Sequence, residues 1–270
     1  MKNILEAKFM VEAIRTFSNL YRLGWDERNG GNLTYLLTDD DVRDYLDTTK
    51  VIREIPFDFD GTALTGKMFL VTGTGEYFKN IQYEPEKDLG IIRIGATGHV
   101  AELLWGFRGG NKFTSELPSH LMSHISRLSV DPLHRVVIHS HPTYTVAMSL
   151  THALTEREFT RSLWKVQTES IVVFPEGISV LPWMVCGNNE IGAATAKKLT
   201  TTRICVWTAH GIYGTGRTLD EAFGLIETVE KAAQLFMLTE GQDRINEISD
   251  RQLKELAASF GLNYRKDYLD

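Results

Sequence analysis

The sequence Val136-Val137-Ile138-His139-Ser140-His141-Pro142 places three β-branched residues directly before a His-x-His pair and closes the run with a proline. β-Branched residues favour extended strands. On a strand, side chains at i and i+2 leave the same face, so the imidazoles of His139 and His141 would point the same way. They would then be close enough to share one metal ion. The stretch therefore predicts a buried strand that ends in part of a metal site.

A third histidine follows another predicted strand. Residues 203–208 have strand-like content and run through Ala209 into His210, while an acidic candidate, Glu116, lies upstream. Three histidines with an open fourth position are typical of catalytic zinc sites, because structural zinc sites fill all four positions. A histidine at a strand end is more often a hydrogen-bonded structural residue. The spacing by itself therefore leaves both a metal site and a structural role open.

The composition is that of a globular chain with net negative charge. The 270 residues are 43% hydrophobic, enough to bury a large core. The formal net charge of −6, without a basic cluster interleaved with aromatic residues, argues against nucleic acid as a partner. No run of about 18 apolar residues is present, so we expect no membrane partner either.

The N-terminal residues and the cysteines favour the cytoplasm. Residues 1–6 mix charge early and lack an apolar signal core with a small-residue cleavage site. Cys186 and Cys205 lie far apart and outside any Cys-x-x-Cys pattern, so we interpret them as free thiols in a reducing compartment. We therefore expect a cytoplasmic protein.

Strand and helix patterns are mixed along the whole chain, without repeats or low-complexity linkers. Strands are predicted over residues 33–37, 50–56, 68–71, 89–95, 100–105, 136–141, 170–174, 178–181 and 204–207. Helices are predicted over residues 4–23, 76–79, 114–128, 143–150, 156–164, 188–199, 218–238 and 251–260. Because strict β-α-β alternation is missing, we predict an α/β fold with a mostly antiparallel central sheet, flanked by helices in αβα layers. We expect a single domain over residues 1–270.

Two glycine-rich loops lie where a phosphate group could bind. Asn29-Gly30-Gly31-Asn32 precedes a predicted strand, and Thr72-Gly73-Thr74-Gly75 separates a predicted strand from a predicted helix. Glycines let backbone N–H groups converge on an anion, and a helix N-terminus favours negative charge. The second loop lacks the Gly-Lys-Ser/Thr ending of a nucleotide-binding P-loop. Alone, each loop is a weak signal, because paired glycines before a strand usually mean only a tight turn.

The predicted helix 114–128 carries several polar residues of interest. Ser115 is a plausible N-cap, and Glu116 would lie at the helix start. His120 and His124 are spaced i,i+4 and could in principle bind metal. Because leucines on the same helix give it an apolar face, we assign these two histidines to the structure rather than to a metal.

The order of these motifs resembles that of the class II aldolase/adducin family. The motifs are residues 29–32, 72–75, 114–117, 139–141 and 210–211. Within the family, five segments most resemble one member, an aldolase that acts on a ketose 1-phosphate. They are residues 24–32, 114–118, 172–175, 181–185 and 218–221. The resemblance spans nearly the whole chain, except residues 39–55 and the C-terminal segment.

The resemblance implies a set of roles for individual residues. It implies one zinc ion per subunit, held by His139, His141 and His210, and a catalytic carboxylate at Glu116. It implies a further catalytic residue, Glu169, that reaches into a neighbouring subunit's site, because the family member is a homotetramer with sites at subunit interfaces. The residues that it implies for binding the phosphate of a phosphorylated ketose are Asn29, Gly31, Asn32, Thr74, Gly75 and Ser115.

The implied activity is a zinc-dependent, reversible retro-aldol cleavage of a ketose 1-phosphate. A sister activity on the same scaffold is the first alternative, either cleavage of fuculose phosphate or epimerisation of a pentulose phosphate. A second is a non-catalytic binding module, since the head domain of adducin resembles this fold, although the retained histidines and Glu116 argue against it. A third is an aldolase that forms a Schiff base on a lysine.

Overall fold

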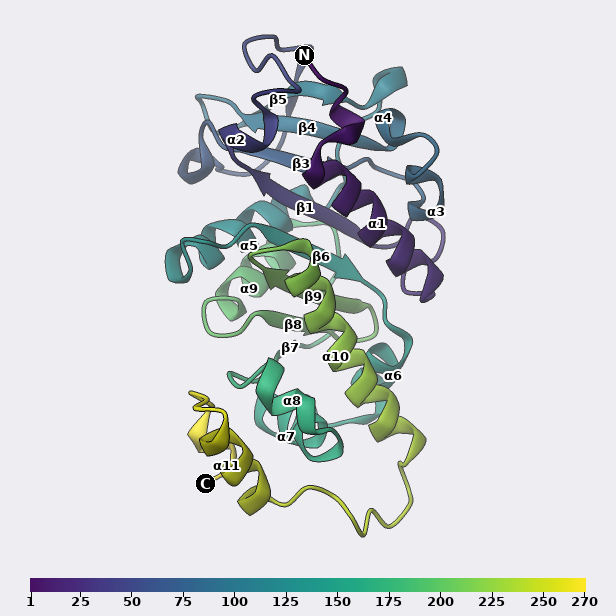
Figure 1. The fold of residues 1–270 in the computed structure, drawn as a ribbon, viewed down its shortest axis with the longest axis vertical. Helices are drawn as coiled ribbons and strands as arrows, with labels where there is room; N and C mark the ends of the chain where they lie inside the picture. The colour runs from purple at the N-terminus through teal and green to yellow at the C-terminus, as the bar shows by residue number, and fades with distance from the viewer.

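The computed structural model describes residues 1–270, and its nine strands form one sheet (Figure 1). The strand order is β2-β5-β4-β3-β1-β6-β9-β8-β7. Only the β7–β8 pair is parallel, and the other seven neighbouring pairs are antiparallel. The strands are β1 Asn32–Leu37, β2 Arg53–Pro56, β3 Met68–Thr72, β4 Leu89–Ile94, β5 Val100–Gly106, β6 Val136–Ser140, β7 Ser179–Leu181, β8 Ile204–Trp207 and β9 Gly211–Gly216. The predicted mostly antiparallel sheet is confirmed.

Helices lie on both faces of the sheet, and Figure 1 shows α1 and α10 crossing the same face. The helices are α1 Lys8–Arg22, α2 Asp39–Val42, α3 Phe78–Ile81, α4 Pro85–Asp88, α5 Leu117–Val130, α6 Thr143–Thr151, α7 Glu156–Val166, α8 Thr168–Val173, α9 Asn189–Lys198, α10 Leu219–Leu238 and α11 Asp250–Ser259. Four 3-10 turns complete them: η1 Ile4–Glu6, η2 Thr62–Leu64, η3 Arg108–Gly110 and η4 Lys266–Tyr268. None of these helices combines the length and the apolar character needed to cross a membrane.

The alternation of side chains along β1 separates two cores. Leu33 and Leu37 point to one face, where they join the large apolar cluster that includes α1 and α10. Leu36 points to the other face and packs with Leu117 and Leu121 of α5. Neighbours along a strand face opposite sides of the sheet, so this central strand is buried on both. The α5 face is the one that carries the polar residues described below.

The predicted strand over residues 170–174 is wrong, because Ser170–Val173 lie in helix α8. Ser170, Ile171 and Phe174 are fully buried, and this i, i+1, i+4 spacing is that of a helix face against the core. The β-branched residues gave a strand signal that tertiary packing overrides. The predicted helix over residues 76–79 is also displaced, since α3 begins only at Phe78.

Strand β9 was not predicted, because its sequence Gly-Ile-Tyr-Gly-Thr-Gly lacks a strong strand pattern. The structure shows why a glycine stands in this strand. A Cβ atom on Gly214 would lie 2.5 Å from the Ile226 side chain of α10, which packs directly on the strand. Close approach of the helix, rather than intrinsic strand preference, determines this residue.

Several chain segments meet at one end of the sheet. β1 begins at Asn32, which is paired with His139 near the end of β6, and His139 is paired with Tyr213 of β9 on its other side. β3 runs antiparallel to β1 and ends at Thr72. The backbone N–H of Thr114, just before α5, donates to the Thr72 carbonyl at 2.9 Å. This register brings loops from distant parts of the sequence to a single place.

Candidate active site

A polar cavity of about 170 Å³ occupies this end of the sheet, and no hydrophobic residue lines it. Its lining residues come from the segment before β1, the turn after β3, the start of α5 and the ends of β6 and β8. They are Asn29, Gly30, Gly31, Asn32, Gly73, Thr74, Gly75, Thr114, Ser115, Glu116, His139, His141 and His210. The cavity therefore collects every residue for which a metal, phosphate or catalytic role was predicted, except Glu169.

Three histidine side chains in the cavity form a group that could hold a metal ion. One ring nitrogen from each of His139, His141 and His210 lies within 4.8 Å of the others. His139 Nδ1 donates to the Ile212 carbonyl at 3.1 Å, and His141 Nδ1 donates to the Glu27 carboxylate at 3.0 Å. Each hydrogen bond fixes the proton on Nδ1, so Nε2 of each neutral ring carries a free lone pair.

The spacing of these two nitrogen atoms fits a cation with tetrahedral coordination. The Nε2 atoms of His139 and His141 are 3.3 Å apart, and two facing lone pairs at that distance repel unless a positive charge lies between them. Two nitrogen ligands with bonds of about 2.0–2.1 Å in tetrahedral geometry would themselves be about 3.3 Å apart. The donor set and its geometry therefore fit a zinc-type ion.

A strained turn carries the third histidine to the cavity. Ala209 has φ 57°, a left-handed conformation that costs a non-glycine residue roughly 1–2 kcal/mol. Its N–H donates to Ser149 Oγ at 3.0 Å, and the N–H of His210 donates to the Trp207 carbonyl at 3.1 Å. These contacts turn the chain back at the end of β8, so that the His210 ring centroid lies 4.9 Å from that of His139.

Burial favours the neutral form of His139 and of His210. The pKa of His139 lies well below its usual value because the ring is fully buried, and the neighbouring His141 and His210 lower it further. Burial also lowers the pKa of His210 to about 4, with a smaller contribution from His141. A neutral imidazole is the form that ligates metals, so protons compete weakly for these nitrogens near neutral pH.

Glu116 lies beside the histidines at the start of α5. Its Oε2 is 3.7 Å from His139 Nε2 and accepts a hydrogen bond from Asn32 Nδ2 at 2.7 Å. Burial raises the pKa of this carboxyl, and the Asn32 hydrogen bond opposes that effect. The predicted N-cap at Ser115 is wrong: Glu116 holds the cap position, without a side-chain capping bond, and Ser115 is left exposed at the cavity.

The loop before β1 is tightly constrained at Gly31. This residue has φ +78°, and a Cβ atom there would lie 1.8 Å from Asp26 Oδ1 and 2.9 Å from the His139 carbonyl oxygen. Asp26 is buried directly behind the loop, and neither of its carboxylate oxygens has a hydrogen-bond partner. Burial, and then the neighbouring Glu27, raise the pKa of Asp26 well above its usual value. Only glycine fits between this carboxyl and the backbone of β6 at His139.

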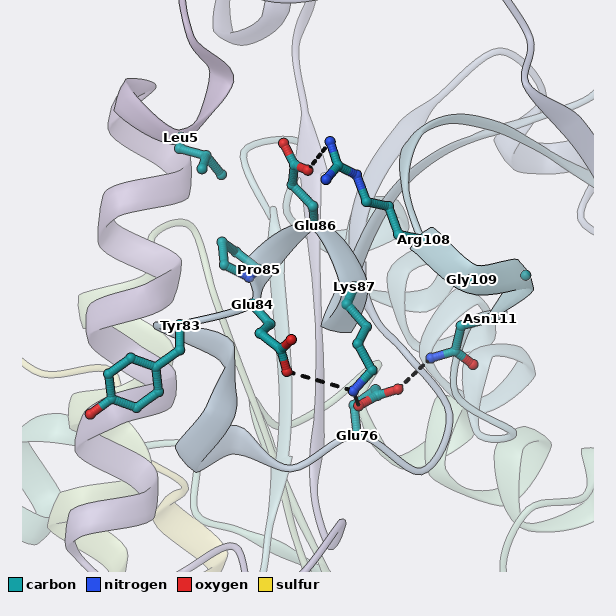
Figure 2. A pocket seen from close by; sticks show the side chains of 11 residues that line it. Leu5, Glu76, Tyr83, Glu84, Pro85, Glu86, Lys87, Arg108, Gly109 and Asn111 are labelled. Carbon is teal, nitrogen blue, oxygen red and sulfur yellow. Dashed lines mark hydrogen bonds and ion pairs between the residues drawn. The ribbon is translucent and has the colours of Figure 1, made fainter.

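A larger cavity of about 810 Å³, shown in Figure 2, lies between η1, the α3–α4 segment and η3. Its charged groups pair with one another: Lys87 Nζ lies 3.2 Å from Glu76 and 3.9 Å from Glu84, and Arg108 pairs with Glu86. No histidine or cysteine lines it. Since size alone supplies no reactive group, the smaller histidine-lined cavity is the better candidate for catalysis.

The comparison with known families agrees with this geometry. A model of the class II aldolase and adducin N-terminal domain matches residues 11–237. The chain belongs to the class II aldolase and adducin family. The family resemblance inferred from the motifs is therefore confirmed.

Relatives within the family differ in how similar they are. A curated protein named rhamnulose-1-phosphate aldolase, from Listeria monocytogenes serotype 4b, is 55% identical over 270 residues, which cover 100% of this chain and 99% of the relative. The crystal structure of a sugar-phosphate aldolase from Thermotoga maritima has a TM-score of 0.73 and 26% identity, covering 84% of this chain and 93% of that one. A solved L-fuculose 1-phosphate aldolase has a TM-score of 0.62 and 19% identity, covering 95% and 98%, and this likeness concerns the fold alone.

Some residues around the site of this family member had no signal in the sequence. Glu27 holds Nδ1 of His141, and Tyr213 OH lies 3.5 Å from Glu116 Oε2. The thiol of Cys186 lies within 4.8 Å of ligand atoms of Glu116 and His210. Glu27 and Tyr213 reach the site through strand pairing and loop closure, which spacing along the chain does not reveal. Both cysteines are free, as predicted.

Glu169 lies apart from the cavity of its own chain. It is exposed near the start of α8 and does not line the site. Its implied role in a neighbouring subunit's site, and the homotetramer on which that role depends, stay predictions. Sedimentation of the purified protein would test the tetramer, and a monomeric chain would remove the basis for this role.

The histidine cluster predicts a defined metal content. Purified protein should bind about one divalent ion per chain, and alanine at position 139, 141 or 210 should lower that content at least tenfold while the chain stays folded. His152→Ala, outside the cavity, is the matched control and should keep full metal content. Elemental analysis and circular dichroism measure both quantities. Full metal content in all three site variants would contradict the assignment.

The contact behind Gly31 predicts unequal costs for two similar substitutions. Gly31→Ala should lower the free energy of unfolding by about 2–4 kcal/mol, through overpacking against Asp26 and backbone strain together. Gly75→Ala is the control, because Gly75 has φ +73° but open space at its Cβ position. It should cost only the strain, about 1 kcal/mol. Chemical denaturation measures both values, and equal costs would show that Asp26 moves away freely.

Proposed function

We propose that the chain catalyses the zinc-dependent, reversible retro-aldol cleavage of L-rhamnulose 1-phosphate to dihydroxyacetone phosphate and L-lactaldehyde, a step of L-rhamnose breakdown in the cytoplasm. The observation that carries this proposal is the 55% identity, over the full chain, to a protein of that name. The cavity supports it independently, since three histidines, one carboxylate and two glycine-rich loops surround one space.

The reaction defines what the site must do. The C3–C4 bond of the ketose phosphate breaks, the C4 hydroxyl loses its proton to become an aldehyde, and the electron pair left at C3 is delocalised onto the C2 oxygen as an enediolate. C3 then takes a proton to give dihydroxyacetone phosphate. A zinc ion held by His139, His141 and His210 would supply Lewis-acid stabilisation of the negative charge. Neutral ligands suit this task, because they leave the ion more electrophilic than thiolates would.

Glu116 is the group that we assign to the proton at C3. Its carboxylate is buried, lies beside the histidines and faces the cavity. Burial raises the pKa of its carboxyl, which makes the carboxylate a better acceptor for a proton from carbon. Asn32 holds one of its oxygens in place, so the other remains available to the substrate.

The glycine-rich loops are assigned to the phosphate. Asn29, Asn32, Thr74 and Ser115 line the cavity with neutral side-chain donors, while Gly31 and Gly75, which also line it, have no side chain to keep an anion from backbone N–H groups. No lysine or arginine lines the cavity, so hydrogen bonds rather than ion pairs would hold the anion. Fixing the phosphate orients the far end of the substrate, which converts binding into rate.

The alternatives differ in how well the site accommodates them. A Schiff-base mechanism needs a lysine at the substrate, and no lysine lines this cavity. A binding module would not require three histidines grouped around one point, two of them with the tautomer fixed by a hydrogen bond. Sister activities on fuculose or pentulose phosphates need the same histidines and carboxylate, so the site geometry does not separate them. Sequence similarity favours rhamnulose phosphate over fuculose phosphate, at 55% against 19% identity.

A cleavage assay with three substrates tests this proposal. L-Rhamnulose 1-phosphate should react at least about tenfold faster than L-fuculose 1-phosphate or a pentulose phosphate, in kcat/KM. A chelator should abolish the activity, and added zinc should restore it. Faster cleavage of fuculose phosphate would reassign the substrate. Activity that survives the chelator, together with a lysine adduct trapped by borohydride, would overturn the metal-dependent mechanism.

Glu116→Gln tests the proton transfer separately from the metal. The variant should keep its metal and bind dihydroxyacetone phosphate, but exchange of the C3 proton of that ligand with solvent should slow by roughly 10²–10⁴-fold. Deuterium incorporation followed by NMR measures the rate on metal-replete protein. Exchange at the wild-type rate would make Glu116 a structural carboxylate and leave the base to be found elsewhere.

A further inference from the structure

Three buried histidines lie behind the cavity and have no part in the metal group. Of the eight histidines in the chain, His120, His124 and His134 are each at most 1% exposed, and none of them lines the cavity. Burying polar rings costs free energy that apolar side chains would save. Three such rings together on one face of the sheet therefore call for an explanation beyond filling the core.

The three rings belong to one continuous hydrogen-bonded chain that ends at Glu116. His134 Nε2 is 2.9 Å from His124 Nδ1, and His124 Nε2 is 2.8 Å from Thr34 Oγ1. Thr34 Oγ1 is also 2.9 Å from His120 Nδ1. His120 Nε2 contacts Asn32 Oδ1, and Asn32 Nδ2 reaches Glu116 Oε2 at 2.7 Å. Thr34 and Asn32 share a face of β1 because they are two residues apart.

The direction of every hydrogen bond follows from the carboxylate end. Ionised Glu116 can only accept, so Asn32 donates through Nδ2 and accepts through Oδ1. His120 must then carry its proton on Nε2, which leaves Nδ1 to accept the Thr34 hydroxyl proton. The Thr34 oxygen in turn accepts from His124 Nε2.

The same reasoning extends to the far end. His124 Nδ1 is then a lone pair, and His134 donates to it from Nε2. This scheme requires three neutral rings with the proton on Nε2. Burial lowers the pKa of His120 and of His134 to about 3, and that of His124 well below its usual value. All three rings are therefore neutral near pH 7.

We propose that His120 is a positioning residue that, through this oriented chain, locks the Asn32 amide with its NH₂ group toward Glu116 and the cavity. The role deepens the proposed function, on which it rests. An amide has two ends of the same shape, and only its partners decide which end faces the site. A flipped Asn32 would set its oxygen against the Glu116 carboxylate and would offer no donor to a phosphate.

This hydrogen-bonded chain is suited to orienting the Asn32 amide rather than to conducting protons. The link next to Glu116 is an amide, which does not pass protons on readily. A buried network in which every member has a partner selects one arrangement of its donors, since any single reversal leaves two lone pairs or two protons facing each other. The arrangement at Asn32 is thereby fixed by groups as distant as His134.

The first test is spectroscopic and does not depend on activity. Metal-replete protein labelled with ¹⁵N-histidine should show His120, His124 and His134 as neutral Nε2–H tautomers, whereas His139 and His141 should be Nδ1–H. Signals are assigned by single substitution. Thr34→Val, which removes the hydroxyl and keeps the shape, should leave the His120 proton on Nε2 but change the Nδ1 chemical shift, because the Nδ1 lone pair loses its donor, and Thr34→Ser should not. An Nδ1–H tautomer at His120 in the wild-type protein would overturn the proposal even if the enzyme is an aldolase.

The second test is kinetic. His120→Leu should lower kcat/KM by about 10–100-fold, the usual cost of losing a residue that orients a group at the site. His120→Gln, which retains a donor toward Asn32, should restore most of the loss, and His152→Leu should have no effect. If His120→Leu does not fold, Thr34→Val takes its place with Thr34→Ser as the rescue.

A double substitution separates positioning from a general structural role. In an Asn32→Ala background, His120→Leu should add less than about a twofold loss in activity, because the residue through which it acts is gone. The free energy of unfolding should still fall in both backgrounds. If His120→Leu lowers kcat/KM by the same factor in the Asn32→Ala background as in the wild-type protein, His120 acts through the general stability of the fold and not through Asn32. If neither the wild-type protein nor any variant cleaves a ketose phosphate, but the expected tautomers are present, the proposed function is wrong and the hydrogen-bonded chain of histidines still stands.

Discussion

The pairing of Asn32 with His139 across β1 and β6 is the contact on which the site depends. In antiparallel strands, residues directly opposite each other have Cβ atoms about 5 Å apart. This register places the Asn32 amide, which Glu116 and His120 of the α5 segment hold, beside the His139 imidazole. A slip of either strand by one residue would turn its side chain to the other face of the sheet, where the large apolar cluster with α1 and α10 lies. The apolar pattern of β1 and β6 thus protects the geometry of a polar cavity.

The cost of burying polar groups is met by assigning each one a partner. The His139 ring packs near those of Trp207 and Tyr213, and its Nδ1 donates a hydrogen bond to the Ile212 carbonyl. Glu116 is held by Asn32. The exceptions are informative, because Asp26 has no partner for either oxygen and lies against Gly31. Burial raises the pKa of that carboxyl well above its usual value, which disfavours a negative charge behind a loop assigned to phosphate.

Sequence reasoning succeeded where the signal is local. Helix α10 follows the predicted range closely, since the Thr218 side chain caps its first turn and apolar residues repeat along one face. The strand predicted over residues 170–174 was wrong because packing decides there. The segment is helical, since this places Ser170, Ile171 and Phe174 together against the core despite the β-branched residues. Sequence reasoning was silent on β9, because glycines that admit α10 weaken the strand pattern.

The sequence by itself determined the donor types of the candidate site and their order: the His-x-His pair, a third histidine after a later strand, a carboxylate at a helix start and two glycine-rich loops. It also determined that His120 and His124 share a helix face with apolar residues. Only the tertiary structure decided that these segments meet, that Glu27 and Tyr213 join them, and that Asn32 and Thr34 link the buried histidines to Glu116. The physical reason is that hydrogen-bond direction and tautomer depend on atoms brought together by strand register, and register is a property of the folded sheet rather than of any one segment.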